Sequence, residues 1–306
     1  MSNISQDEYL SRIYKVQDYI EINYFKNTSV EKLARVAGFS KYHFNRIFKS
    51  VVNESISQYV NRIRIEHSLF LLGYRTDISL TNIALELGYT DSATFSRAFK
   101  TYYGMSPSSY RKEHRTKCKE NIFISEYNEP VKKKKWVQKS YSDLGEIRIE
   151  SRDERIAVYV RHVGDYRSLK RNYAKLMQQL MIESVKQHLM DQVNVEILAM
   201  YHDNPEFGQE EQFRTSLCIS LPKESNPRET EKLGVMQIEG GLYAIGHFKI
   251  QQEQFQDAWD FMYQQWLITS DYVPRDICPF EVYLNNPMEE PDHHIEVDIY
   301  MPIEPI

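Results

Sequence analysis

A single carboxylate stands out in the second half of the chain because aromatic residues accompany it. Glu281 lies in FEVYL, residues 280–284, where strand alternation predicts that it shares one face with Tyr283. Trp259 and Trp266 recur at helical spacing in a preceding segment, and Tyr201 occupies a segment similar to that of Tyr283. Each of these residues alone would more often be core or exposed surface. Together they predict a binding site for a hydrophobic cation, through charge pairing and cation–π contact.

The same carboxylate could instead serve catalysis. Glu281 could act as a general base that activates water against a small electrophile, with Tyr283 assisting. A third possibility is a domain that only sequesters a compound. No cofactor and no metal are expected, because the neighbours His293 and His294 lack the spacing of a metal-binding motif.

In the first half of the chain, side chains suited to DNA gather in two segments. Arg46 and Arg97 could make bidentate contacts to guanine, and Asn45 could do so to adenine. The complete set expected to face the bases is Tyr42, Asn45, Arg46, Ala93, Thr94 and Arg97. The set expected at phosphates, which position a protein without specifying a sequence, is Ser40, Lys41, Lys49, Thr90, Ser92 and Lys100. For any one of these residues, a solvated helix surface is an equally good interpretation.

The two segments belong to a repeat. GFSKYHFNRIFK, residues 38–49, is followed fifty residues later by GYTDSATFSRAFK, residues 88–100. Each glycine is expected to end one helix, since glycine tolerates the left-handed conformation. Ser40 and Thr90 are the expected caps of the helices that follow. The pattern predicts two helix-turn-helix units, and a pair of ordinary helical hairpins is the alternative.

A helix is expected between the two units. The segment SISQYVNRIRIEHSLFLL, residues 55–72, spaces Val60, Ile63, His67 and Leu71 as one stripe. A rigid helix here would fix the two recognition helices relative to each other. To read successive turns of one DNA face they must lie roughly 34 Å apart. A monomer could then do what usually takes a dimer.

These motifs carry a resemblance to a known family. Residues 8–113 resemble the DNA-binding domain of AraC/XylS-type transcription regulators, most specifically over IALELGYTDSATFSRAFKTYYGMSPSSYR, residues 83–111. The first unit departs from the pattern, because it lacks the Gly and Pro of GMSPSSY. The resemblance implies an all-α domain of two helix-turn-helix units and two partners, double-stranded DNA and RNA polymerase.

The chain repeats itself again after residue 146. LAMYHDNP, residues 198–205, parallels FEVYLNNP, residues 280–287, with Glu281 in place of Ala199. We expect an α+β domain of two pseudo-symmetric β-α-β-β repeats, with a groove for a ligand at their junction. RIAVYVRHVGDY, LAMYHDNP, AWDFMYQQWL and PFEVYLNNP resemble the GyrI-like small-molecule-binding domain. That resemblance implies a ligand-contacting Glu281, walls formed by Tyr201, Trp259, Trp266 and Tyr283, and a small, hydrophobic and cationic effector.

Composition and charge agree with two domains. Residues 1–115 carry more basic than acidic side chains, whereas residues 146–306 are strongly acidic within a chain of net charge −5. We expect a DNA-binding domain over 1–115, a linker over 116–145 that contains the run Lys132–Lys135, and an effector-binding domain over 146–306. Scattered cysteines and the lack of a long apolar run predict a cytoplasmic protein that does not enter a membrane. The DNA-binding half favours a sensor, and we expect that the protein is not an enzyme.

Overall fold

The computed structural model describes residues 6–75, 77–113, 146–203, 210–267, 269–286, 290 and 292–305. The expected linker over 116–145, with its lysine run, lies outside the described residues. No helix in the described part of the chain is long and apolar enough to cross a membrane.

Three helices form the first unit: α1 (Gln6–Asn23), α2 (Val30–Val36) and α3 (Lys41–Val52). Apolar residues at helical spacing in α1, among them Ile13, Val16 and Ile20, pack against the inner faces of α2 and α3. Phe44 and Phe48 of α3 are fully buried in this core. The repeated phenylalanines of the sequence are therefore core residues that hold the second helix of the unit in place.

The second unit is built in the same way. The long helix α4 (Ile56–Tyr74) leads into α5 (Leu80–Glu86) and α6 (Ser92–Tyr103), with Phe95 and Phe99 fully buried. Ser55 caps α4 in a capping box with Gln58. The structure thus confirms the helical first domain and the single helix between its two units.

The turn inside the second unit requires glycine. Gly88 has φ of +79°, and a Cβ added there would lie 2.2 Å from the carbonyl oxygen of Phe25. The expected cap of the next helix is wrong, because Asp91 rather than Thr90 is the N-cap residue. The Asp91 carboxylate accepts from the Thr94 amide at 2.7 Å, and Thr90 donates its hydroxyl to the same carboxylate.

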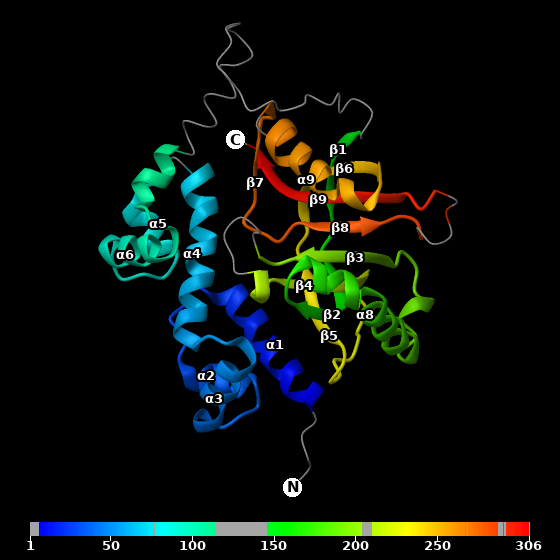
Figure 1. Cartoon of the computed structure of the whole chain (residues 1–306), viewed down its shortest axis with the longest axis horizontal. Helices are drawn as coiled ribbons and strands as arrows, with labels where there is room; N and C mark the ends of the chain where they lie inside the picture. Colours follow the sequence, from blue (N-terminus) through cyan, green and yellow to red (C-terminus); the bar gives the residue numbers. More distant parts are fainter. Residues whose placement is uncertain are drawn as a thin grey trace, which may run out of the picture.

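The second domain is a curved antiparallel sheet with helices on one face (Figure 1). Its strands are β1 (Ile147–Arg152), β2 (Arg155–Val163), β3 (Glu196–Tyr201), β4 (Arg214–Pro222), β5 (Gly234–Ile238), β6 (Gly241–Ile250), β7 (Tyr272–Pro274), β8 (Phe280–Tyr283) and β9 (Ile295–Pro305). Neighbouring strands follow the order β1-β6-β9-β8-β3-β4-β2-β5, with β7 paired to β9. The first half contains one strand more than the expected β-α-β-β, and the second half, which includes β7, contains two more. β1 and β5 each pair with a strand of the other half.

Two helices cover one face of the sheet. α8 (Tyr166–Lys186) packs against β2, β3 and β4, while α9 (Phe255–Asp260) packs against β6 and β9. A π-helical segment, η5 (Phe261–Leu267), continues α9. The opposite face carries a separate apolar core that contains Tyr159, Met200 and Phe280.

The helical domain docks at one end of the sheet, with α1 between the other helices and the strands (Figure 1). Arg161 of β2 donates to the carboxylate of Asp18 in α1 at 2.7 Å, and the Tyr159 hydroxyl donates to the other oxygen of that carboxylate. The Arg161 side chain is fully buried, and its guanidinium carbon lies 4.6 Å from the centroid of the Tyr159 ring. Burial alone would lower the pKa of Arg161, but Asp18 and Tyr159 together outweigh this effect and the pKa is raised.

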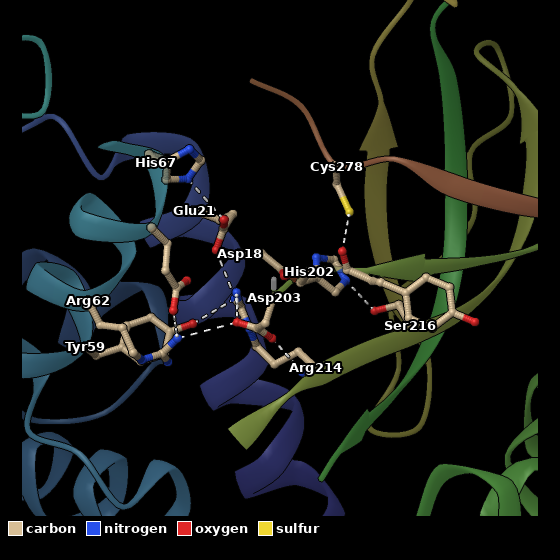
Figure 2. Close-up of polar contacts among 12 residues, drawn as sticks. Asp18, Glu21, Tyr59, Arg62, His67, His202, Asp203, Arg214, Ser216 and Cys278 are labelled. Carbon is tan, nitrogen blue, oxygen red and sulfur yellow. Dashed lines mark hydrogen bonds and ion pairs between the residues drawn. The ribbon is translucent and has the colours of Figure 1, made fainter. Parts of the chain in front are cut away.

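A second arginine makes the same kind of contact. Arg214 of β4 donates to Glu21 of α1 at 2.9 Å and to the hydroxyl of Tyr59 in α4 at 2.9 Å. Its remaining donors bind Asp203, with a closest distance of 2.8 Å. Figure 2 shows this group of contacts between the helices and the strands. We use the term junction for the set of polar side chains that joins the two domains. Its members are Asp18, Glu21, Tyr24, Tyr59, Arg62, His67, Tyr159, Arg161, Asp203, Arg214 and Asp276.

The junction predicts a large effect of one conservative substitution. Asp18→Asn leaves the guanidinium of Arg161 buried without its counter-charge, and breaking a buried pair in this way costs about 3–5 kcal/mol. Urea unfolding of the full chain measures this loss. Glu8→Gln is the matched control on the same helix, because its partner Arg12 is partly exposed, and it should cost less than about 1 kcal/mol. Equal losses for the two variants would contradict a charge-paired junction.

Candidate functional site

The expected DNA-contacting residues lie on α3 and α6. On α3, Asn45, Arg46 and Lys49 are exposed, and Tyr42 lies one turn before Arg46. Lys41, at the start of α3, pairs with Glu31 of α2. The exposed set is polar and basic along one side, opposite the phenylalanines that face the core.

On α6, Ala93, Arg97 and Lys100 are exposed, and Thr94 is half-buried. Arg97 donates to the hydroxyl of Thr94 at 3.2 Å, and that hydroxyl donates to the cap residue Asp91 at 3.0 Å. This chain of bonds holds the Arg97 side chain along the first turns of the helix. Thr90 and Ser92 lie beside it at the start of α6, as Ser40 does before α3.

The second candidate site centres on Glu281 of β8. Its carboxylate accepts from Trp259 Nε1 at 2.7 Å, from the hydroxyl of Tyr201 at 2.9 Å and from the hydroxyl of Tyr283 at 2.9 Å. We call these four residues the Glu281 cluster. Glu281 pairs directly with Ala199 of β3, which leaves room above the small side chain for the carboxylate. The expected position of Tyr283 on the same face as Glu281 is confirmed.

The cluster is closed and electrostatically unbalanced. Glu281 is only 1% exposed, so the structure places a buried carboxylate where the sequence predicted an open groove. Burial raises the pKa of Glu281 to about 6, although the three hydrogen bonds oppose this shift. Burial and the negative charge of Glu281 also raise the pKa values of Tyr201 and Tyr283 well above the usual range. The neighbours of this carboxylate stabilise its charge with neutral donors.

Two tyrosines of α8 extend the aromatic surroundings and were not predicted. Tyr166 packs edge-on against Tyr201 with ring centroids 5.9 Å apart, and the charge of Glu281 helps to raise the pKa of Tyr173 after burial. Tyr166 is 42% exposed and Tyr173 is 37% exposed. Their spacing of seven residues on one helix face was the signal that could have identified them.

Trp266 occupies a different place from the one expected. It stacks on Tyr272 of β7, with ring centroids 6.3 Å apart, whereas Trp259 reaches Glu281. The physical reason is the π-helical turn of η5, which is wider than an α-turn. Seven residues along this segment therefore do not return to the same face.

No group of three or more His, Cys, Asp or Glu side chains in the described ranges is arranged to hold a metal ion. His294 bonds Asp292, two residues before it.

Comparison with protein families assigns both parts of the chain. Residues 145–304 match the family model of the GyrI-like small molecule binding domain. Residues 33–113 match that of a helix-turn-helix domain of the AraC type. The second match begins inside α2 and covers both recognition helices.

Curated relatives match through the first domain. The Msm operon regulatory protein of Streptococcus mutans is 34% identical over 112 residues, which are 37% of this chain and 39% of that protein. An uncharacterized HTH-type transcriptional regulator of Staphylococcus aureus is 33% identical over 100 residues, which are 33% of this chain and 13% of that protein. The chain thus spans less than half the length of these relatives.

Solved structures give more distant matches. The C-terminal domain of EcmrR covers 53% of this chain and 99% of its own, at 18% identity and a TM-score of 0.43. A DNA-binding transcriptional dual regulator from Escherichia coli K-12 covers 35% of this chain and 94% of its own, at 22% identity and a TM-score of 0.32.

The raised pKa of Glu281 predicts a pH-dependent stability. Because the folded pKa is about 6 and the ordinary value is 4.5, the folded chain holds the proton more tightly, and this contribution is lost as the pH rises through 6. Between pH 4.5 and 7.5 the free energy of unfolding should fall by about 1.5 kcal/mol more in the parent than in Glu281→Gln. Urea titrations at each pH measure this difference. A difference that is flat or rises with pH would contradict the raised pKa.

Proposed function

The chain belongs to the AraC-type helix-turn-helix regulators that carry a GyrI-like small molecule binding domain, and from this premise we propose that it is a ligand-responsive transcription regulator. The first domain binds duplex DNA with α3 and α6 in successive major grooves. The second binds a hydrophobic cation at the Glu281 cluster. We propose domain limits of 1–115 and 146–306 with a connecting linker.

The observation that carries the effector proposal is the buried carboxylate on which three neutral donors converge. Both oxygens of Glu281 already accept hydrogen bonds from neutral donors. The carboxylate therefore lacks a positive charge rather than a donor, and a cation without N–H groups can supply that charge. A quaternary cation gains from the negative charge and from the faces of Trp259 and Tyr201. Entry requires the side chains above Glu281 to move, and the exposed Tyr166 and Tyr173 mark the side of α8 on which this happens.

Sensing is favoured over hydrolysis by the same geometry. A general base needs a lone pair directed at water, whereas the Glu281 oxygens face Trp259, Tyr201 and Tyr283. The domain is also joined through a buried junction to two helix-turn-helix units. Contact with RNA polymerase stays a prediction.

The DNA-binding proposal predicts different effects for two neighbouring residues. Arg97→Ala should cost about 1–3 kcal/mol of binding free energy and relax the preference at one base position, because Arg97 is exposed and bonded to Thr94 along the first turns of α6. Lys100→Ala should weaken all sequences alike, since a phosphate contact carries no sequence information. Binding of the full chain to a library of randomised duplexes measures both.

Arg46→Ala extends this test to the first unit. It should relax a position about one helical turn of DNA away from the one affected by Arg97→Ala. If both variants altered the same position, or if Arg97→Ala weakened specific and random DNA equally, reading of two successive grooves would be wrong.

The effector proposal predicts selectivity by charge. Tetraphenylphosphonium should quench Trp259 fluorescence in the full chain, and Glu281→Gln should weaken its binding at least about tenfold, because the paired charge is lost. Tetraphenylborate, which has the same shape and the opposite charge, should not gain from Glu281 in the parent. The double substitution Trp136→Phe and Trp266→Phe removes the two competing tryptophan signals. If Glu281→Gln bound the cation as tightly as the parent, the site would lie elsewhere.

A further inference from the structure

The Glu281 cluster and the junction share two strands. β3 and β8 are antiparallel neighbours, with Ala199 opposite Glu281. In Figure 1, β3 runs toward the helical domain and β8 runs away from it. The end of β3 and the start of β8 therefore lie together at the edge of the sheet that faces the helices.

The end of β3 passes from the cluster into the junction within three residues. The Tyr201 hydroxyl donates to Glu281. Asp203 then accepts from Arg214 and, at 3.4 Å, from Arg62 of α4 (Figure 2). The Asp203 side chain is 3% exposed, and it also accepts from the backbone amide of Arg214 at 2.6 Å. This residue cannot move without changing the contacts of an arginine on the helix between the two DNA-binding units.

The approach to β8 makes a second connection. Cys278 donates its thiol to the backbone carbonyl of Tyr201 at 3.2 Å. Two residues earlier, Asp276 binds His67 of α4 at 2.8 Å and accepts from the Tyr24 hydroxyl at 3.0 Å. The His67 ring stacks on Tyr24 with centroids 3.9 Å apart, and its other nitrogen faces Glu21 at 3.3 Å.

These contacts keep the junction charged at neutral pH. Burial alone would lower the pKa of His67, but Asp276 and Glu21 raise it to about 10. Burial and the nearby Arg161 and Arg214 lower the pKa of His202 well below its usual value. At neutral pH His67 is thus charged and His202 neutral, whereas burial raises the pKa of Glu66, which pairs with Arg62, to about 7.

We infer that Tyr201 transmits occupancy of the Glu281 cluster to the DNA-binding domain, through Asp203 and its contacts with Arg62 and Arg214. This inference rests on the proposed effector site. A cation that packs on the ring of Tyr201 beside Glu281 shifts this side chain and the end of β3. Asp203 stays bound to the backbone of Arg214, so the shift alters the contact with Arg62 on α4. Since α4 separates α3 from α6, the junction changes between a docked and a loosened state that differ in DNA affinity.

Tyr283 provides a matched control within the cluster. Its hydroxyl donates to the same oxygen of Glu281 at the same 2.9 Å as Tyr201. The residues that follow Tyr283 lead away from the helical first domain. Leu284 donates its amide to the carbonyl of Glu296, and Asn285 donates its side-chain amide to the carbonyl of His294. Loss of the Tyr283 hydroxyl therefore removes an equal bond to Glu281 without reaching the junction.

The first experiment needs no ligand. Hydrogen exchange of the full chain is compared for the parent, Tyr201→Phe and Tyr283→Phe, over the amides of residues 17–22 in α1 and 58–68 in α4. Tyr201→Phe should raise exchange rates there at least about fivefold, and Tyr283→Phe should leave them within about twofold. Cys278→Ala, which removes the other contact with Tyr201, should act in the same direction as Tyr201→Phe. Equal exchange in Tyr201→Phe and Tyr283→Phe would overturn the inference.

The second experiment uses tetraphenylphosphonium and a duplex selected by the full chain. In the parent and in Tyr283→Phe, the cation should change the Kd for DNA at least about fivefold, and DNA should change the Kd for the cation by the same factor. In Tyr201→Phe the factor should fall within about twofold while the cation still binds. Full coupling in Tyr201→Phe would overturn the inference. Failure of the cation to bind the parent would overturn the proposed effector, while the exchange comparison would still decide the role of Tyr201.

Discussion

The structure depends on the pairing of two buried arginines of the sheet with carboxylates of the first helix. Arg161 is fully buried and pairs with Asp18, while Arg214 is 2% exposed and pairs with both Asp203 and Glu21. Such pairs add little net stability compared with apolar residues, but losing one partner is costly. They are directional, so they fix how the two domains sit against each other more narrowly than an apolar contact would.

The first helix can serve both domains because its two sides differ. Ile13, Val16 and Ile20 fill the core of the first helix-turn-helix unit, whereas Asp18 and Glu21 point to the sheet. The spacing of three and four residues places each set on its own side of the helix. α4 repeats this division, with Ile63 in the core and Arg62 and His67 at the junction. The expected apolar stripe through His67 is therefore interrupted by a charged contact.

Local patterns made much of the fold predictable. Glycine turns and the spacing of phenylalanines are short-range signals, and they identified both helix-turn-helix units. Strand alternation placed Glu281 beside Tyr283 for the same reason. The junction could not be predicted, because Arg161 and Asp18 are 143 residues apart and no pattern links them. An arginine inside the apolar run RIAVYVRHV requires a carboxylate partner, but the sequence does not show which residue provides it. Trp266 was misplaced because a π-helical turn leaves no sequence periodicity of its own.

The two buried charged regions of the second domain differ in how their charges are balanced, and this difference supports the proposed ligand site in one of them. At the junction the buried arginines face carboxylates, so a further ion would have to displace an existing partner. At Glu281 the groups that shift its pKa within the described residues are Trp259, Tyr201 and Tyr283, which donate hydrogen bonds without a positive charge. The cost of burying this carboxylate is therefore only partly offset, and the proposed cationic ligand would supply the missing positive charge. Tyr201 bonds Glu281 through its side chain and lies two residues before Asp203 of the junction. A ligand that neutralises Glu281 would therefore act close to the junction as well.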